Sequence, residues 1–595
     1  MQTYNSRSEV PDKYKWDLTE YFKSEDELKE TIKKTEELMS NIPKYQGKLK
    51  NPDTLLEFFK LMNETGTYVE DIYVYTYLVN DQELGNSNSM KNKAIAENLY
   101  AKFSSSLSFV EPEILSFTES EYNSLYNDSK LNDYKFALNQ IYRAKEHVLS
   151  ENEERIITEL THAADHYDDM SSTMLNSEHN YGSIDIDGET KIITPTNYRN
   201  LMKNDNSEIR KSIRKQYTEK LNEYGATSAQ LLNSYVSLSE TEAKIRKYKS
   251  SWDAKLFNLN IPNEVFSTLV STVESRVSSL QEYFKLFKSE LGLEELTLND
   301  LNLEMSKNEH KYTIEEAQDL CLKALAPLGS DYSSHFKKVF DNHYIDYCTY
   351  KGKCSGGYSF NTSTKDSRIL LSFNEDLEDV STIIHEGGHN VHHQYVKANN
   401  PVHYREISSL VCEVASLTNE CLLSSYLAKN GRDKNEKLAG IDNILGVIIS
   451  NLFGAVREGK MEEDFHNEYL TNGSITKDFM DKLTVDSLSK YYGDTVKLDT
   501  LANVSWMRRS HYYMNFYLYS YSICISVASF IAKHILDGDT EMLDKYIKFL
   551  STGGDTWPID AFKVLGIDLT DSKVYEEAID YFDNLINEYK KIKSN

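Results

Sequence analysis

The stretch "STIIHEGGHNVHHQY", Ser381 to Tyr395, holds four of the chain's 15 histidines and one glutamate. The apolar residues at its start predict a partly buried helix, in which histidine and glutamate need polar partners. His385, Glu386 and His389 form the pattern H-E-x-x-H. Two histidines four residues apart lie on one helix face, about 6 Å apart along the axis. Both imidazoles can therefore bind one metal ion.

The glutamate of this pattern points away from the two histidines by part of a turn, so it need not bind the metal. Zinc lowers the pKa of water at an open coordination position, and a neighbouring carboxylate can take up the proton. The pattern predicts His385 and His389 as zinc ligands and Glu386 as the general base of a hydrolase.

The other two histidines do not fit as ligands. The metzincin pattern requires glycine and histidine where this chain has His392 and Tyr395. His392 lies about 10 Å beyond His385 along the helix axis, too far for both to bind the same ion. We interpret His392 as a pocket residue or a residue that supports the ligands, and His393 as an ordinary polar residue.

A catalytic zinc ion needs a third protein ligand and an open fourth position. The stretch "ISSLVCEVASLTNE", residues 407–420, reads as an apolar helix with Glu413 in its middle. An unpaired carboxylate there would be costly, so we predict Glu413 as the third ligand. Glu420 can orient a zinc-bound histidine through its free ring N–H. Two alternatives stay open: Glu413 could form a salt bridge instead of binding a metal, and Glu420 could be an ordinary polar residue.

The chain outside these stretches predicts a mainly α protein. It has only nine prolines and 24 glycines in 595 residues, and apolar residues recur at helical spacing. Asp187-Gly188 indicates a β-hairpin, and residues 368–373 read as a strand just before the histidine helix. We predict an N-terminal helical domain over residues 1–190 and a catalytic domain with the metal site and a small sheet over residues 191–595.

Composition restricts the partners and the location. The net charge of −27, from 93 acidic and 66 basic residues, argues against nucleic acid and anionic membranes as partners. No run of about 18 apolar residues and no secretory signal is visible. The six cysteines have no compact metal-binding spacing. We expect a cytoplasmic protein with neither nucleic acid nor a membrane as partner.

Several blocks together resemble a known family. They are "SGGYSFNTSTKDSRILLSFNEDLEDVSTIIHEGGHNVHHQY" (355–395), "EISSLVCEVASLTNECLL" (406–423), "WMRRSHYYMNFYLYSYSICIS" (506–526) and "YKWDL" (14–18). The family is the M3 family of zinc metallopeptidases, which includes thimet oligopeptidase-like enzymes, and the oligoendopeptidase F branch is the most similar. The resemblance extends from near the start of the chain to about residue 530.

The resemblance implies a large helical closed shell around a deep channel, with a small sheet next to the H-E-x-x-H helix, as in gluzincins. It implies one Zn²⁺ per chain, held by His385, His389 and Glu413, with Glu386 as base. The substrates would be short unstructured peptides cut at internal bonds. It also implies that the strand 368–373 lines the cleft, where its edge can pair with an extended peptide.

Two further groups of residues are expected near the substrate. Gly356, Gly357 and Tyr358 precede the strand and are candidates for the cleft. The tyrosine-rich block contains the following candidate donors to the developing oxyanion, a role that the resemblance assigns to this segment: His511, Tyr519, Tyr521 and then Tyr517. The alternative is an aromatic helix packed in a core, which would account for at least two of the tyrosines in this block.

One feature departs from the family pattern. The family usually has a bulky apolar residue and then glycine after the glutamate, whereas this chain has Gly387-Gly388. Two glycines inside a helix cost about 1 kcal/mol each relative to alanine. Two other functions stay open: a peptide-binding protein with a structural zinc, which would need no base, and a carboxypeptidase, which would need a group that captures the terminal carboxylate.

Overall fold

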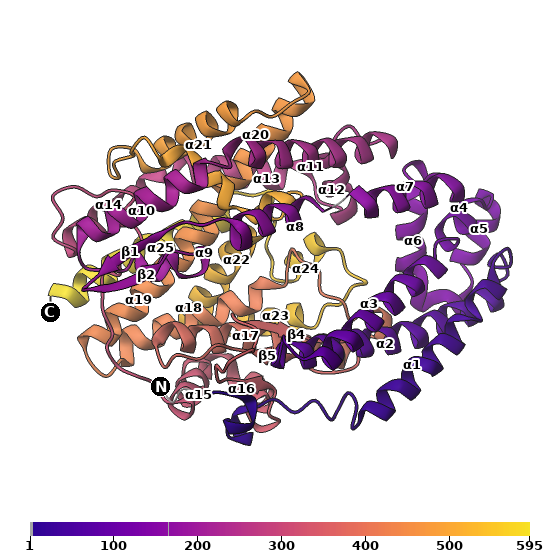
Figure 1. Ribbon diagram of the computed structural model, residues 1–595. Helices are drawn as coiled ribbons and strands as arrows, with labels where there is room; N and C mark the ends of the chain where they lie inside the picture. The colour runs from indigo at the N-terminus through magenta and orange to yellow at the C-terminus, as the bar shows by residue number, and fades with distance from the viewer. Residues whose placement is uncertain (1–3, 165, 595) are drawn as a thin grey trace. The chain divides into compact units, whose positions relative to one another are not determined.

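The computed structural model describes residues 4–164 and 166–594. Helices dominate it (Figure 1), which confirms the prediction of a mainly α protein. Its internal contacts group the chain into two units, each described here by itself. The domain boundary expected at residue 190 stays a prediction. Unit 1 comprises Met1–Thr158, Glu309–Leu423 and His534–Gly566, and unit 2 comprises Glu159–Asn308, Ser424–Lys533 and Ile567–Asn595.

Unit 1 contains the histidine helix and a three-stranded sheet. Its strands are β3 (Ile345–Asp346), β4 (Tyr358–Phe360) and β5 (Arg368–Leu370). Its helices are α1 (Glu25–Met39), α2 (Pro52–Gln82), α3 (Ser87–Ser106), α4 (Val110–Leu115), α5 (Glu119–Tyr126), α6 (Lys135–Arg143), α15 (Ile314–Ala324), α16 (Gly329–Asp341), α17 (Leu377–Asn399), α23 (Thr540–Leu550) and α24 (Pro558–Val564). Helices α7 (Glu151–Ala164), α18 (Glu413–Asn430) and α22 (Leu518–Leu536) have residues in both units.

The sheet of unit 1 has the order β3-β5-β4. Its central strand β5 pairs in parallel with β3 and antiparallel with β4, so that Ile369 lies between Ile345 and Ser359. The strand predicted over residues 368–373 is therefore present but shorter, and it has no free edge. The free edge on the side of the β4–β5 hairpin belongs to β4.

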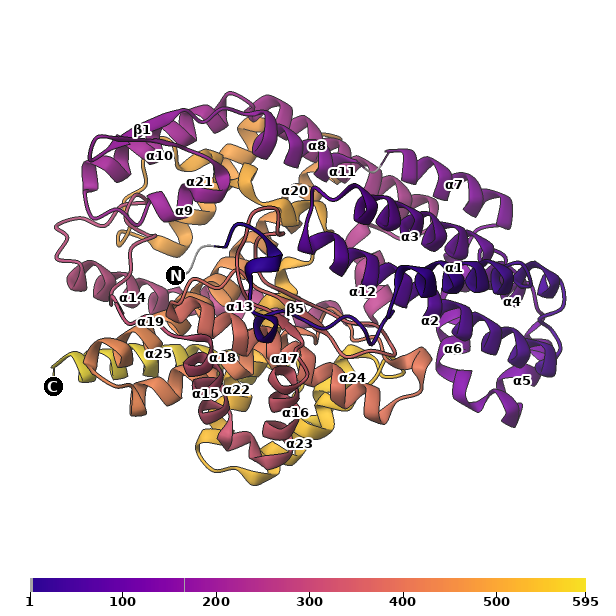
Figure 2. The same cartoon turned by 60° about the horizontal axis from the view of Figure 1, so that its bottom comes forward.

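Helix α17 lies among helices from distant parts of unit 1. Figure 2 shows α15, α16 and α18 around it. Val380, Ile384 and Val391 of α17 are fully buried. The C-terminal part of unit 1 also contacts α17, because Nδ2 of the helix's last residue, Asn399, donates a hydrogen bond to Ser551 Oγ at 3.3 Å. The histidine helix is thus held on several sides.

Unit 2 is also built from helices, with one two-stranded sheet. The hairpin joins β1 (Ser183–Ile186) to β2 (Glu189–Ile192) through Asp187 and Gly188, whose φ angles are 54° and 82°, as its sequence predicts. Its helices are α8 (Tyr167–Ser172), α9 (Pro195–Leu201), α10 (Ser207–Asn222), α11 (Gly225–Ile245), α12 (Ser251–Leu259), α13 (Asn263–Ser275), α14 (Val277–Glu290), α19 (Lys434–Ile448), α20 (Ala455–Asn472), α21 (Lys477–Tyr492) and α25 (Lys573–Ser594).

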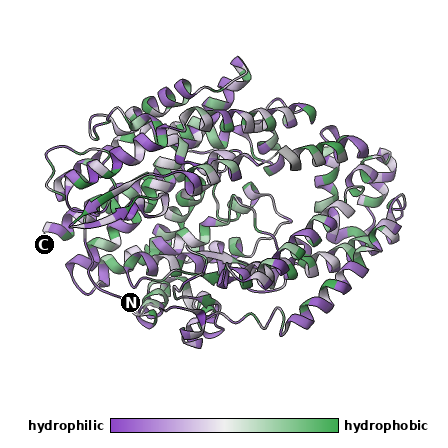
Figure 3. Cartoon of the chain, viewed as in Figure 1, coloured by the Kyte–Doolittle hydropathy of each residue, from purple (hydrophilic) through white to green (hydrophobic). Residues whose placement is uncertain are grey.

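Two helical stretches are long and apolar enough to pass a test of composition for membrane spans, namely Lys434–Asn472 and α22. Burial explains their composition, because 83 % of the apolar window in α22 and 56 % of the other window lie inside the structure. Most helices carry hydrophobic and hydrophilic residues in alternation (Figure 3), as packing on one face requires. The two stretches are therefore weak evidence for a membrane.

Candidate active site

The sequence fixes where the histidine helix begins. The Asp376 side chain accepts a hydrogen bond from Asp379 N at 3.0 Å, and the Asp379 side chain accepts one from Asp376 N at 3.1 Å. This reciprocal cap satisfies two backbone donors at the start of α17. The helix then continues without interruption to Asn399, so His385 and His389 lie on one face of a regular helix.

Three predicted ligands come together. His385 Nε2 lies 3.3 Å and His389 Nε2 lies 3.4 Å from Glu413 Oε2. The potential ligand atoms of the three residues all lie within 4.8 Å of one another, and no other such group occurs in residues 4–164 and 166–594. Two ligands of a tetrahedral zinc ion are about 3.3 Å apart. The residues present therefore fit a zinc ion.

A second layer of hydrogen bonds orients these side chains. Glu420 Oε1 lies 2.6 Å from His385 Nδ1, and Glu420 Oε2 accepts a hydrogen bond from Ser381 Oγ at 3.0 Å. Ser416 Oγ donates to Glu413 Oε2 at 2.9 Å. With Nδ1 engaged, the Nε2 atom of His385 is the one that faces Glu413. Glu420 thus contacts the ring nitrogen of His385 that faces away from Glu413, and its role in orienting a bound metal's ligand stays a prediction.

Sequence reasoning missed the two serines. The signal was available, because Ser381 precedes His385 by one helical turn and Ser416 follows Glu413 by almost one turn. Residues at these spacings lie side by side on a helix and can share hydrogen-bond partners.

The start of α18 differs from the prediction. Glu413 was expected in the middle of a helix, but it is the first residue of α18. The backbone N–H groups of Val411 and Cys412 donate to the carbonyl oxygen of Ser408 at 3.0 and 3.1 Å, so the chain forms a turn before the helix begins. A carboxylate at a helix N-terminus is also favoured by the helix dipole.

The electrostatics favour a cation at this site. Burial alone raises the pKa of Glu413, but the hydrogen bond from His385 and the charge of His389 hold it well below its usual value. Burial alone lowers the pKa of His385, whereas Glu413 and Glu420 raise it well above its usual value. Two carboxylates thus face one imidazole, and a bound cation can take the place of the proton that they stabilise.

The predicted base lies beside the ligands. Glu386 follows His385 directly on α17, and its exposed fraction is only 8 %. The side chains of His385, His389 and Glu413 are 24 %, 22 % and 16 % exposed, so one side of the group is open to solvent. A water molecule can reach this side, and a carboxylate at the edge of a partly dry site can accept its proton.

The remaining histidines of the opening stretch are packing residues. His392 and His393 are each 1 % exposed. The His392 ring lies 6.1 Å from the ring of Phe549, and burial lowers the pKa of His392 to about 3. The role predicted for His392, to line a pocket or to support the ligands, stays a prediction, and its side chain is buried inside unit 1.

The structure explains Gly387 and Gly388. A Cβ atom on Gly387 would lie 2.4 Å from the ring of Phe336 on α16. A Cβ atom on Gly388 would lie 2.8 Å from the Cα atom of Ser416 on α18. Both distances are shorter than real carbon contacts. The two glycines therefore let two helices approach α17, and Phe336 occupies the space beside residue 387.

The residues expected in the cleft lie at the start of the edge strand. Gly356 has a φ of 101°, which favours glycine, and its N–H donates to Ser372 Oγ at 3.2 Å. A Cβ atom on Gly357 would lie 2.9 Å from Thr382 on α17. The hydroxyl of Tyr358 donates to Asp81 at 2.7 Å. Tyr358 is thus tied to α2, and the chain before it needs both glycines.

The tyrosine-rich block lies in unit 2 and separates into two groups. The rings of His511, Tyr517 and Tyr521 form a cluster, with centroids 6.2, 5.8 and 5.2 Å apart, and all three are partly exposed. Tyr519 is 1 % exposed and packs on Trp252. Its surroundings are those of a core residue rather than a donor to substrate. The sequence could have predicted this separation, because at helical spacing residues 517 and 521 lie on one face and residue 519 lies on another.

The profile of peptidase family M3 matches residues 200–581, and that of oligopeptidase F matches residues 113–181. The chain belongs to peptidase family M3. Relatives support this assignment along the whole chain. Oligopeptidase PepF of Bacillus subtilis is 32 % identical over 590 residues, which cover 98 % of this chain and 88 % of the relative. An oligoendopeptidase F homolog of Borreliella burgdorferi is 30 % identical, with 99 % of each chain covered.

A solved structure agrees with this assignment. The M3 peptidase has a TM-score of 0.73 and 26 % identity with the crystal structure of oligoendopeptidase-F from Enterococcus faecium, over 96 % of this chain and 99 % of that one. The fold and the family predicted from the sequence are thus confirmed. The M3 peptidase is an enzyme of a metallopeptidase family that acts on peptides.

Proposed function

We propose that this M3 peptidase is a zinc-dependent oligoendopeptidase that cuts internal bonds of short unstructured peptides. The observation that supports it most directly is the convergence of His385, His389 and Glu413 beside the buried carboxylate of Glu386. The names oligopeptidase and oligoendopeptidase F among its relatives support the same substrate class. We also propose a cytoplasmic location, one zinc ion per chain, and neither nucleic acid nor membrane as partner.

In the proposed mechanism, His385 Nε2, His389 Nε2 and Glu413 hold the metal, and Glu420 keeps His385 in the tautomer and orientation that this requires. Zinc, when bound, polarises the scissile carbonyl and makes water more acidic. Glu386 takes a proton from the attacking water and later delivers it to the nitrogen of the leaving amine. The buried position of Glu386 limits competing water around this proton transfer.

The substrate would be held by backbone pairing in unit 1. Strand β4 lies at the edge of the sheet, and Gly357 at its start packs against α17. We propose that an extended peptide adds to the free edge of β4, since main-chain pairing is tolerant of sequence and requires an unfolded substrate. This assigns to β4 the role that the sequence suggested for residues 368–373.

The oxyanion would be stabilised by side chains of the ring cluster in unit 2. We propose His511, Tyr517 and Tyr521 as hydrogen-bond donors, the role that the resemblance to the family assigns to this segment. Tyr519, whose hydroxyl is buried in the core of unit 2, is left out of the proposed donors.

Metal removal tests the proposed function. Dialysis against a chelator should abolish cleavage of a quenched fluorescent peptide, and one equivalent of zinc per chain should restore it, because three protein ligands form a single site. Mass spectrometry of the products should show cuts at internal bonds. Full turnover in the metal-free protein would contradict the proposal, and release of single C-terminal residues would indicate a carboxypeptidase instead.

The substitution Glu420→Ala should weaken zinc binding by about 10- to 100-fold, because it removes the acceptor that fixes His385. Competition with a metal-binding dye measures this affinity. Ser381→Ala is the matched control, because it removes only the hydroxyl that donates to Glu420 and should have a smaller effect. Unchanged affinity in Glu420→Ala would show that the hydrogen bond to His385 does not support the metal.

A further inference from the structure

A strained turn lies in the middle of the tyrosine-rich block. Asn515 and Phe516 connect the short 3-10 helix η11 (Ser510–Tyr513) to α22, and their φ angles are 41° and 59°. Among the described residues they are the only adjacent pair of non-glycine residues with positive φ. Residues other than glycine adopt this conformation at a cost, and it persists only where the surroundings hold it.

The surroundings hold this turn at Phe516. Its N–H donates a hydrogen bond to Glu462 Oε1 on α20 at 2.6 Å. Its ring is 2 % exposed and lies 4.6 Å from the ring of His466 and 4.7 Å from that of Trp252. Glu462 and His466 are four residues apart, so one face of α20 provides both the acceptor and a ring contact.

Glu462 is an unusual acceptor. Its side chain is fully buried, and its second oxygen, Oε2, has no hydrogen-bond partner within the described part of the chain. Burial raises its pKa to about 8, and Lys255 is the cation that opposes this effect. A buried carboxyl with so few partners is costly, so its retention beside a strained turn needs an explanation.

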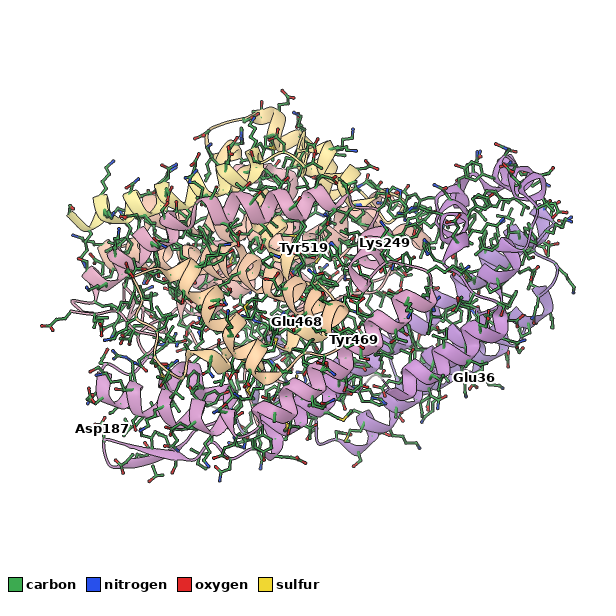
Figure 4. The ribbon with its side chains drawn as sticks, turned by 90° about the horizontal axis from the view of Figure 1, so that it is seen from above. Glu36, Asp187, Lys249, Glu468, Tyr469 and Tyr519 are labelled. Atoms are coloured by element: carbon green, nitrogen blue, oxygen red, sulfur yellow. The ribbon has the colours of Figure 1, made fainter. Side chains whose placement is uncertain are left out.

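The turn lies between the residues of the ring cluster. His511 precedes it, and Tyr517 and Tyr521 follow it, yet their rings lie 5.2 to 6.2 Å apart. A turn that relaxed toward negative φ would redirect the chain between His511 and Tyr517. Figure 4 labels Tyr519, which follows the turn and packs on Gly459 of α20, so the segment after the turn is fixed on the same helix.

We propose that Glu462 is a positioning residue for catalysis, which holds the turn at Asn515-Phe516 and thereby sets the geometry of His511, Tyr517 and Tyr521. This inference rests on the proposed function of these three side chains as donors to the oxyanion. Glu462 itself does not touch the substrate. It acts through the backbone N–H of Phe516.

The test compares two substitutions. Both Glu462→Leu and Glu462→Gln remove the carboxyl group, but only Glu462→Leu removes the oxygen that accepts the hydrogen bond from Phe516 N–H. We expect Glu462→Leu to lower kcat by about 100-fold with KM changed by less than about threefold, because a small misplacement of donors affects the transition state. Glu462→Gln should stay within about threefold of the wild type. Glu468→Leu, at a position on the same helix that Figure 4 labels, is the control.

A second substitution separates positioning from misfolding. Asn515→Gly allows positive φ without strain, so in the Glu462→Leu background it should restore at least about a tenth of the wild-type kcat. Loss of kcat that Asn515→Gly does not restore, together with a collapsed melting temperature, would overturn the inference in favour of a structural role.

His511→Ala distinguishes this inference from the proposed function. If His511→Ala lowers kcat while Glu462→Leu does not, the donor role stands and the positioning role is wrong. If neither substitution lowers kcat, the donor role fails, and the inference fails with it.

Discussion

The substitution Glu386→Gln is expected to reduce peptide hydrolysis by at least about 1,000-fold, within the range that loss of a general base produces. Glutamine has nearly the same size as glutamate but cannot accept the proton of the attacking water. Because His385, His389 and Glu413 are untouched, the variant should still bind a single zinc ion. Steady-state cleavage of a quenched peptide and metal analysis of the purified variant measure both properties.

The matched control is Glu378→Gln, since Glu378 is an exposed glutamate in the first turn of the same helix. It should leave turnover within about twofold of the wild type, as for most surface substitutions. Full turnover by the Glu386→Gln variant would refute the proposed mechanism. A wild-type protein that binds zinc and peptides without cleaving them would instead be the peptide-binding protein with a structural zinc.

The substitution Gly388→Ala is expected to separate α17 from α18. The added Cβ atom would lie 2.8 Å from Ser416 Cα and 2.9 Å from Ser416 N, and a backbone cannot rotate away as a side chain can. Overpacking of this kind costs about 1–3 kcal/mol. Because α17 carries His385 and His389 and α18 carries Glu413, zinc affinity should fall by at least about 10-fold if these three residues hold the metal as proposed. A thermal melt and competition with a metal-binding dye measure the two effects.

Gly446→Ala is the matched control for this substitution. Gly446 also lies inside a helix, α19, but a Cβ atom there would meet nothing within 4 Å. Alanine should therefore stabilise that helix by up to about 1 kcal/mol. We expect Gly446→Ala to raise the melting temperature. If Gly388→Ala raised it too, there would be room for a Cβ atom at residue 388, and the close approach of α17 and α18 would not require glycine there.

The grouping of His385, His389 and Glu413 could be predicted because it depends on local geometry. A spacing of four residues places His385 and His389 on one helix face in any fold. Glu413 could be predicted because a carboxylate in an apolar stretch needs a cation. The start of α18 at Glu413 could not be predicted. The turn around Ser408 is formed by backbone hydrogen bonds, which leave no periodic pattern in the sequence.

Structural features that depend on contacts between residues far apart in the chain could not be predicted from the sequence. Gly387 and Gly388 are explained by Phe336 and Ser416, which lie 51 and 28 residues away along the chain, as their numbers show. The order of the sheet likewise depends on β3, a two-residue strand that is too short to give a pattern of its own. Secondary-structure propensity describes one helix or strand at a time, whereas these contacts join different helices and strands.

The segment His534–Gly566 belongs to unit 1, although the chain spends more than a hundred residues in unit 2 before returning to it. Phe549 packs on His392, and Gly554 N–H donates to the carbonyl oxygen of Tyr404 at 2.7 Å. During synthesis, the histidine helix and the residues after it therefore meet these packing partners only after the ribosome has passed residue 554. Nascent chains that stop before residue 534 therefore lack the contacts that this segment makes with His392 and Tyr404.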